Sequence, residues 1–104
     1  MLLFKPYHIP LILEGRKTQT RRIWKKCRCR VGSVHQARTE LFGEPFAKLR
    51  ILRVWQERLG DISDSDAKAE GYPNRVVFLE SFENINGATD LSTMVWCVEF
   101  EVVR

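Results

Sequence analysis

The sequence has no long hydrophobic run, and this absence indicates where in the cell the protein is expected. No apolar stretch approaches the roughly 20 residues that a membrane-spanning helix needs. The start of the chain, Met-Leu-Leu-Phe, is too short for a signal peptide and is soon followed by Lys5, Pro6 and His8. We therefore expect a cytoplasmic protein that has no membrane partner.

Cysteine and histidine are also scarce. The three cysteines, Cys27, Cys29 and Cys97, are an odd number and do not predict a disulfide framework. Together with His35 they could in principle supply four zinc ligands. However, Cys27 and Cys29 lack the usual two-residue gap of a zinc site, and no second pair exists. We expect free thiols, no metal and no cofactor, and we treat His8 and His35 as structural.

The length of the chain indicates its domain organisation. At 104 residues it has the size of one domain, which we place at residues 1–104. A chain of this length buries roughly two thirds of its unfolded surface, so it can fold without disulfides or metals. Hydrophobic residues make up 44% and charged residues 29% of the sequence, which is typical of a globular protein. No internal repeat or low-complexity tract is visible.

Negative charge is nearly absent from the first half of the chain. Residues 1–56 contain 13 Lys and Arg but 3 Asp and Glu, whereas residues 57–104 contain 4 and 10. Eight of the cations lie between Arg16 and Arg30, and no acid follows them before Glu40. Such a stretch is either a solvated charged face or a surface that binds phosphate groups, and charge alone does not decide between the two.

The cationic stretch begins with residues 15–22, Gly-Arg-Lys-Thr-Gln-Thr-Arg-Arg, hereafter the basic block. No hydrophobic residue interrupts it, so core packing does not explain its composition. Gly15 tolerates a positive φ and predicts a turn. Alternation along an extended strand divides the side chains that follow between two faces. One face holds Lys17, Gln19 and Arg21, and the other holds Thr18, Thr20 and Arg22. The block is either an edge strand protected by charge or a site for an anionic or nucleic-acid-like ligand.

Strand patterns dominate the chain, with helix patterns between them. Alternation predicts strands over residues 17–24, 34–39, 46–57 and 93–103. Capping and turn residues predict helices over residues 6–14, from an N-cap at Ser63 to Glu70, and from about residue 73 to a stop at Gly87. This order favours an α+β fold with a small, mostly antiparallel β-barrel and short flanking helices.

Glu70 does not suit its place in the predicted helix. It falls in the last turn, where the helix dipole disfavours an anion. Either a cation from the basic block compensates it, or Glu70 is an exposed glutamate that costs a few tenths of a kcal/mol. Local inconsistencies of this kind tend to mark functional residues. We therefore predict that Glu70 lies within ion-pair reach of Lys17.

Five short blocks, in this order, resemble the ASCH domain family of the PUA-like superfamily. They are the basic block, Val-Gly-Ser at 31–33 where the family often has Val-Gly-Asp, Phe-Ala-Lys-Leu-Arg-Ile at 46–51, Asp-Ala-Lys-Ala-Glu-Gly-Tyr at 66–72, and Val-Trp-Cys-Val-Glu-Phe at 95–100. The resemblance spans nearly the whole chain. It implies a PUA-like β-barrel with helices packed on its outside and a cleft lined by the basic block.

The resemblance also implies a set of candidate catalytic residues. Some small bacterial members of the family are amidohydrolases that remove the acetyl group from N4-acetylcytidine. Their catalytic set, a lysine, a threonine three residues later and a distant glutamate, matches Lys17, Thr20 and Glu70 here. Thr20 would be the nucleophile, Lys17 its base and Glu70 a proton relay. Positions 17 and 20 point to opposite faces of a regular strand, so this requires that Lys17 lie in the glycine turn or that a bulge intervene.

A structural role is an equal alternative for these three residues: Lys17 and Glu70 would form an ion pair that closes the barrel, and Thr20 would be a buried, hydrogen-bonded hydroxyl.

Among the possible functions we place first an RNA- or nucleotide-binding module, because the cationic density exceeds what a neutral nucleoside needs. RNA or a modified nucleoside or nucleotide is the expected partner, and the sequence identifies no protein partner. The expected nucleic-acid surface, hereafter the basic strip, comprises Arg16, Arg21, Arg22, Trp24, Lys25, Lys26, Arg28 and Arg30. The amidohydrolase is the alternative. A ribonuclease, an activity linked to some ASCH proteins, is the weaker one, because no histidine pair or acidic metal cluster lies in the basic region.

Overall fold

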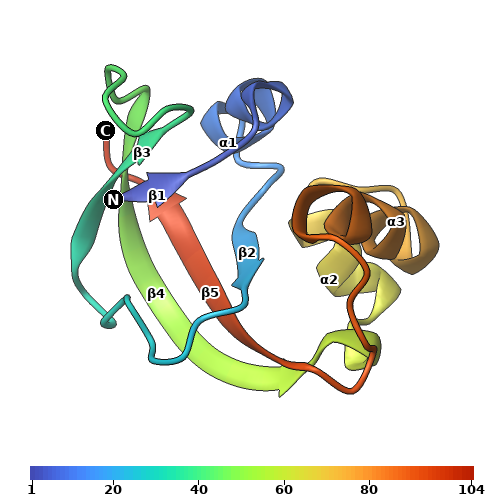
Figure 1. Cartoon of the computed structure of the whole chain (residues 1–104). Coiled ribbons are helices and arrows are strands. Elements are labelled where there is room, and N and C mark those ends of the chain that lie inside the picture. The colour runs from blue at the N-terminus through green and yellow to red at the C-terminus, as the bar shows by residue number, and fades with distance from the viewer.

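The computed structural model describes residues 1–104 and contains one five-stranded sheet that curls into a half-barrel (Figure 1). The strands are β1 (Leu2–Leu3), β2 (Gln19–Arg22), β3 (Val34–Arg38), β4 (Ala47–Arg58) and β5 (Met94–Val102). Their order across the sheet is β1-β3-β4-β5-β2. β1 runs parallel to β3, and every other neighbouring pair is antiparallel. The α+β class and the mostly antiparallel, barrel-like sheet are thus confirmed, with the sheet forming a half-barrel between the edge strands β1 and β2.

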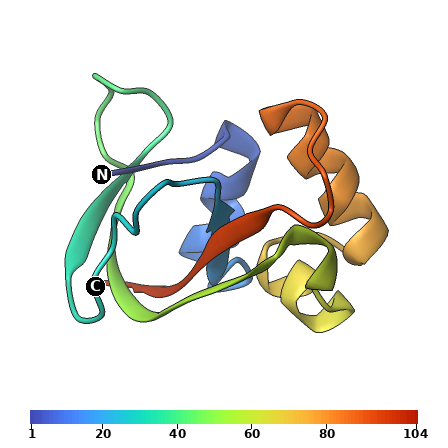
Figure 2. The ribbon, with the colours of Figure 1, turned by 60° about the horizontal axis from the view of Figure 1, so that its bottom comes forward.

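The helices lie in two groups along the chain. The first group, η1 (Pro6–His8) and α1 (Ile9–Leu13), connects β1 to β2. The second group, η2 (Leu59–Asp61), α2 (Asp64–Ala69) and α3 (Arg75–Asn86), connects β4 to β5. Figures 1 and 2 show α2 and α3 lying together on the β2 side of the half-barrel, apart from α1. None of these helices is both long enough and apolar enough to cross a bilayer.

Local sequence fixes where α2 and α3 begin and where α2 ends. The Ser63 hydroxyl accepts the backbone N–H of Asp66 at 3.0 Å, and the Asn74 side chain accepts that of Val77 at 3.0 Å. Glu70 is the C-cap residue of α2, and Gly71 follows it with a φ of +99°. The predicted N-cap at Ser63 and the helix stop after Glu70 are therefore confirmed.

The first strand is shorter than predicted because Lys17 belongs to the turn that precedes it. The backbone N–H groups of Arg16 and Lys17 both donate to the Leu11 carbonyl, at 2.9 and 3.0 Å. The Thr18 N–H then donates to the Ala69 carbonyl at 2.7 Å, so the chain reaches α2 before it joins β5. Strand β2 therefore starts at Gln19, not at residue 17. The strand β1, which is only two residues long, was not predicted.

Two hydrophobic clusters form the core. One comprises Leu2, Phe4, Ile12, Ala37, Leu49, Ile51, Val98 and Phe100. The other joins the second helix group to the sheet and comprises Leu59, Ile62, Ala67, Phe78, Phe82, Val95 and Cys97. Several polar side chains are buried as well, among them Lys17, Gln19, Thr20, Arg21 and Glu70. Four of these five come from the basic block, so this charged segment lies largely inside the protein.

Candidate functional site

A buried ion pair joins the basic block to the end of α2. The Lys17 Nζ donates to Glu70 Oε1 at 3.0 Å, to the Glu70 carbonyl at 2.8 Å and to the Gln19 carbonyl at 2.9 Å. All three ammonium donors are therefore used. Lys17 is only 2% exposed, and burial lowers its pKa further than the Glu70 carboxylate raises it. The prediction that Glu70 lies within ion-pair reach of Lys17 is confirmed.

Arg21 joins the same network from β2. Its side chain is 0% exposed, and Nη1 donates to Glu70 Oε2 at 3.1 Å and to Gln19 Oε1 at 2.8 Å. Its Nε and Nη2 reach Glu57 at 2.7 and 2.6 Å, and Nη2 also reaches Asp66 at 3.2 Å. These contacts occupy all five guanidinium donors. Arg21 belongs to the predicted basic strip, but these contacts leave none of its donors free for a phosphate.

Thr20 and Arg22 point to the other side of β2. The Thr20 hydroxyl accepts a hydrogen bond from Arg22 Nε at 2.9 Å, and Thr20 is buried. Arg22 Nη2 donates to the Leu3 carbonyl at 2.7 Å, and Arg22 Cζ lies 5.0 Å from the centre of the Phe4 ring. Arg22 therefore links β2 to β1, the two edge strands of the half-barrel. Within β2 the predicted alternation is confirmed, with Gln19 and Arg21 joined on one side and Thr20 and Arg22 on the other, whereas Lys17 lies outside the strand.

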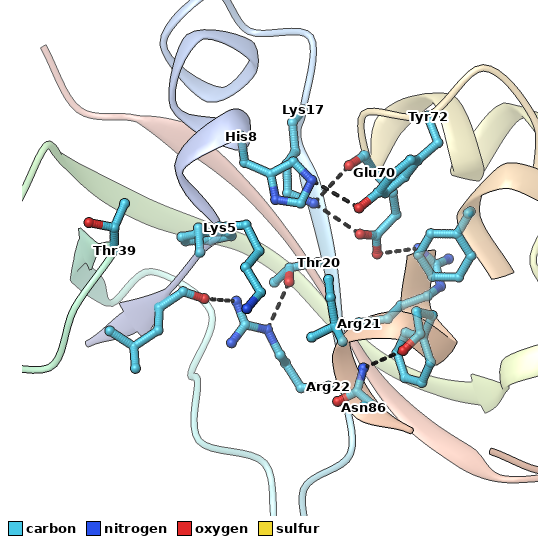
Figure 3. A pocket seen from close by; sticks show the side chains of 15 residues that line it. Lys5, His8, Lys17, Thr20, Arg21, Arg22, Thr39, Glu70, Tyr72 and Asn86 are labelled. Atoms are coloured by element: carbon cyan, nitrogen blue, oxygen red, sulfur yellow. Dashed lines mark hydrogen bonds and ion pairs between the residues drawn. The ribbon is translucent and has the colours of Figure 1, made fainter. Parts of the chain in front are cut away.

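A cavity of about 330 Å³ lies against this polar network (Figure 3). Lys17, Thr20 and Glu70 all line it, as do Arg21 and Arg22. Its apolar and aromatic lining comes from Leu3, Phe4, Tyr72, Phe78, Phe82 and Ile85. Lys17 and Thr20 share the cavity because Lys17 lies in the turn before β2. No hydrogen bond joins Lys17 to Thr20, since their partners are Glu70 and Arg22 respectively.

Sequence reasoning missed several residues that line the cavity. His8, Lys5, Thr39 and Asn86 fall in no motif that would have marked them, and Tyr72 ends the block at 66–72 but was given no role. His8 Nε2 lies 3.1 Å from the Tyr72 hydroxyl, which also lies 2.7 Å from the Ser81 hydroxyl. Burial, together with the positive charges of Lys17 and Arg22, lowers the pKa of His8 to about 3. His8 is therefore neutral at physiological pH and contributes a hydrogen-bonding ring to the wall of the cavity.

The rest of the basic strip lies outside the cavity. Lys25, Lys26, Arg28 and Arg30 are exposed on the segment that follows β2. Arg16 is also exposed and pairs with Glu14 at 2.7 Å. Trp24 is half-buried and packs against the first core cluster, with Arg28 Cζ 5.9 Å from its ring centre. Of the predicted strip, only Arg21 and Arg22 line the cavity.

Comparison with known proteins gives one family and several solved structures. A family model described as "ASCH domain" matches residues 7–104. The structure of an ASCH domain from Lactobacillus crispatus superposes with a TM-score of 0.78 at 18% identity, covering 92% of this chain and 70% of that chain. The protein EF3133 from Enterococcus faecalis, of family DUF984, superposes with a TM-score of 0.75 at 20% identity, covering 93% and 67%.

The hypothetical protein PH0355 superposes with a TM-score of 0.76 at 12% identity, covering 98% of this chain and 96% of that chain. No curated protein sequence matches the chain significantly. At these identities the structural likeness shows a shared fold, and the activity has to be argued from the residues of this chain.

Proposed function

The chain belongs to the ASCH domain family, and from this premise we propose that it binds one nucleotide unit, free or within RNA, in the cavity beside the basic block. The observation that carries the proposal is the lining of this 330 Å³ cavity, in which Lys17, Thr20 and Glu70 lie among aromatic rings. Its volume is at the small end of the range for ligand pockets. Proteins recognise unpaired bases by stacking them on aromatic rings and hydrogen-bonding their edges, and this lining offers both.

The exposed part of the basic strip supports the RNA form of the ligand. Lys25, Lys26, Arg28 and Arg30 lie exposed within nine residues of the cavity residue Arg22, and none of them forms an ion pair. Exposed, unpaired cations attract phosphates and release condensed counterions when they bind. A single strand with one nucleotide in the cavity could therefore extend along these residues.

The salt dependence of RNA binding tests this proposal. The logarithm of the affinity for single-stranded RNA should fall with the logarithm of the salt concentration, by about 0.7 per phosphate contact. Lys26→Ala should flatten that slope by about 0.7, because it removes one contact. Lys48→Ala, which removes an exposed lysine on β4, is the charge-matched control and should leave the slope unchanged. An affinity for RNA that does not depend on salt would contradict the proposal.

A second candidate is hydrolysis of an N4-acylated cytidine, which is favoured by Lys17, Thr20 and Glu70 lining the same cavity. The Thr20 oxygen would attack the acyl carbonyl, and neutral Lys17 would take the hydroxyl proton. The amide C–N bond would break, the cytosine amine would leave with that proton by way of Glu70, and water would hydrolyse the acyl-threonine ester. The lowered pKa of Lys17 supports the role of base.

The direct test incubates the purified protein with N4-acetylcytidine and follows cytidine release by chromatography. Release at a rate proportional to protein concentration is the expected result for the hydrolase. If no cytidine appears although the nucleoside binds, the hydrolase is rejected and the binding function stands alone.

A further inference from the structure

We propose that Arg22 and Lys5 form a phosphate subsite at one end of the cavity, so that the ligand is a nucleotide unit and not a neutral nucleoside. This inference rests on the proposed nucleotide-binding function and specifies its ligand. Figure 3 shows Lys5 and Arg22 on one side of Thr20, with Glu70 and Tyr72 on the other. A base placed beside Tyr72 and Glu70 would direct its phosphate toward Arg22.

The charges around the cavity are balanced at one end only. Four cationic side chains line it, Lys5, Lys17, Arg21 and Arg22, and Glu70 is its only carboxylate. One oxygen of Glu70 binds Lys17 and the other binds Arg21, and Arg21 also pairs with Glu57 and Asp66 behind the cavity lining. Neither Lys5 nor Arg22 forms an ion pair with any carboxylate of the chain. Positive charge at their end of the cavity is therefore left without a counterion.

The guanidinium of Arg22 is held in place by neutral partners. Thr20 accepts from its Nε and the Leu3 carbonyl accepts from its Nη2, while the Phe4 ring lies against it. These contacts fix a flexible side chain before any ligand arrives, which reduces the entropy that binding costs. They also leave the guanidinium charge unopposed, since a hydroxyl, a carbonyl and a ring carry no net charge.

Part of the Arg22 guanidinium remains free to bind. Its Nη1 has no hydrogen-bond partner in the protein. The only buried side-chain polar atoms without a hydrogen-bond partner are Arg38 Nε and Trp96 Nε1. Because Arg22 Nη1 has no partner and is not one of these buried atoms, it is accessible from outside the protein. A planar guanidinium with free donors matches the geometry of phosphate oxygens.

Comparison with Arg21 shows what Arg22 lacks. Burial lowers the pKa of both arginines, but Glu70 and Glu57 reverse this effect for Arg21, and its pKa is raised. For Arg22 burial prevails over the more remote Glu70, and its pKa is lowered. A bound anion would supply the compensation that Arg21 obtains from the protein.

Lys5 supplies the second cation of the subsite. It follows Phe4, whose ring centre lies 5.0 Å from Arg22 Cζ, and its side chain lines the same cavity as Arg22. Lys5 is exposed, and a long flexible ammonium of this kind can follow a phosphate at the mouth of the cavity. The hydroxyl of Thr39 lines the same cavity and adds a neutral hydrogen-bonding group.

Calorimetric titration with nucleosides and nucleotides tests the subsite. The probes are the four ribonucleosides, their 5′-monophosphates and the dinucleoside monophosphate CpC. A charge-assisted hydrogen bond to the phosphate should strengthen binding about 10- to 100-fold. We expect this difference between the best monophosphate and its nucleoside, or between CpC and cytidine. Tight binding of the monophosphate supports a free nucleotide as the ligand. Tight binding of CpC alone supports an RNA phosphodiester.

Variants at the subsite should remove this preference and leave base recognition intact. Arg22→Gln should bring nucleotide and nucleoside affinities to within about threefold of each other, on the same charge-assisted bond estimate. Lys5→Ala, at an exposed position that does not endanger the fold, should weaken nucleotide binding alone. Lys48→Ala serves as the control and should change neither affinity.

Two results with wild-type protein would contradict these proposals. If it binds nucleosides and nucleotides equally, the subsite is rejected while nucleotide-unit binding survives. If it binds none of the probes, the proposed function itself fails, and the subsite fails with it.

Discussion

Lys17 Nζ lies 3.0 Å from Glu70 Oε1, although 53 residues separate the two in the chain. Both side chains are nearly fully buried, at 2% and 4% exposure. The second oxygen of the same carboxylate lies 3.1 Å from Arg21 Nη1. One glutamate at the C-cap of α2 therefore pairs with two buried cations, and this explains why an anion is tolerated where the helix dipole disfavours it.

We expect removal of the Glu70 carboxylate to destabilise the fold strongly. In Glu70→Ala, Lys17 and Arg21 would lose the carboxylate that pairs with both, and breaking a buried pair in this way costs about 3–5 kcal/mol. The free energy of unfolding in urea measures the loss. Glu14→Ala removes the exposed partner of Arg16 and should cost less than about 1 kcal/mol. Similar losses for the two variants would show that the buried network does not hold the barrel to α2.

Gly71, directly after Glu70, combines a positive φ with close packing against Leu11, and substitution should show both effects. Its φ is +99°, and an added Cβ would lie 3.0 Å from Leu11 Cδ1. Gly15 has a similar φ of +76° with nothing within 4 Å of such a Cβ. Gly15→Ala should therefore cost only the backbone strain, about 1–2 kcal/mol. Gly71→Ala should cost roughly 1 kcal/mol more, because the tip of Leu11 must move. Denaturant unfolding of the matched pair measures this difference, and equal losses would rule out a role for the close contact.

Much of this architecture could be predicted because it depends on local rules. The cap at Ser63 follows from a side chain that accepts the backbone N–H three residues further along the chain. The opposite directions of Arg21 and Arg22 follow from strand alternation within β2. The Lys17–Glu70 contact followed from an anion at the wrong end of a helix, which is a local conflict that only a distant cation could resolve.

The burial of Arg21 could not be predicted, because it depends on three carboxylates far away in the sequence. Glu57, Asp66 and Glu70 lie 36, 45 and 49 residues further along the chain, so a window around residue 21 shows only cations. The cavity wall at Lys5 and His8 was missed for a related reason. The two-residue strand β1 that leads into it is too short to show alternation.

Trp24 should contribute to both stability and RNA binding, since it is half-buried and lies on the basic strip. Truncating a fully buried tryptophan to alanine lowers the free energy of unfolding by about 3–5 kcal/mol. Because Trp24 is only half-buried, we expect Trp24→Ala to lower it by roughly half as much, near 2 kcal/mol. Trp24→Phe keeps a ring for packing and stacking and should stay folded with modestly weaker RNA binding. Its salt slope should equal that of wild type, because stacking releases no counterions. A flattened slope for Trp24→Phe would argue against the stacking role.

The protein should lose stability as the pH falls below 6.5, in part through His8. Its pKa is lowered to about 3 in the folded state, so the unfolded chain binds the proton more readily between these values. The contribution of His8 is therefore complete above pH 6.5 and is lost as the pH falls toward 3. A single histidine binds one proton, so His8 can change the free energy of unfolding by at most about 1.4 kcal/mol per pH unit. Urea unfolding at several pH values should give a shallower slope for His8→Gln than for wild type; parallel curves would show that His8 binds its proton equally well in both states.

The hydroxyl of Thr20 distinguishes a hydrolase from a protein that only binds its ligand. If Thr20 is the nucleophile, Thr20→Val should lower the rate of N4-acetylcytidine hydrolysis by about 10⁴-fold or more, whereas Thr20→Ser keeps a hydroxyl and should retain measurable turnover. Lys17→Arg should also be inactive, because a guanidinium does not act as a base at neutral pH.

The pH profile and the double variants complete this test. Lys17 accepts a proton only when neutral, so the wild-type rate should rise with pH and level off below 10.5, the ordinary pKa that burial lowers here. Residues that act as a unit give non-additive losses, so the variant that combines Thr20→Val with Lys17→Arg should be little slower than the worse single variant. Nucleotide affinity, measured in parallel, identifies variants that have merely lost the cavity. Independent, additive losses in Thr20→Val and Lys17→Arg would instead indicate that Lys17 serves the buried ion pair with Glu70 and that Thr20 serves only to orient Arg22.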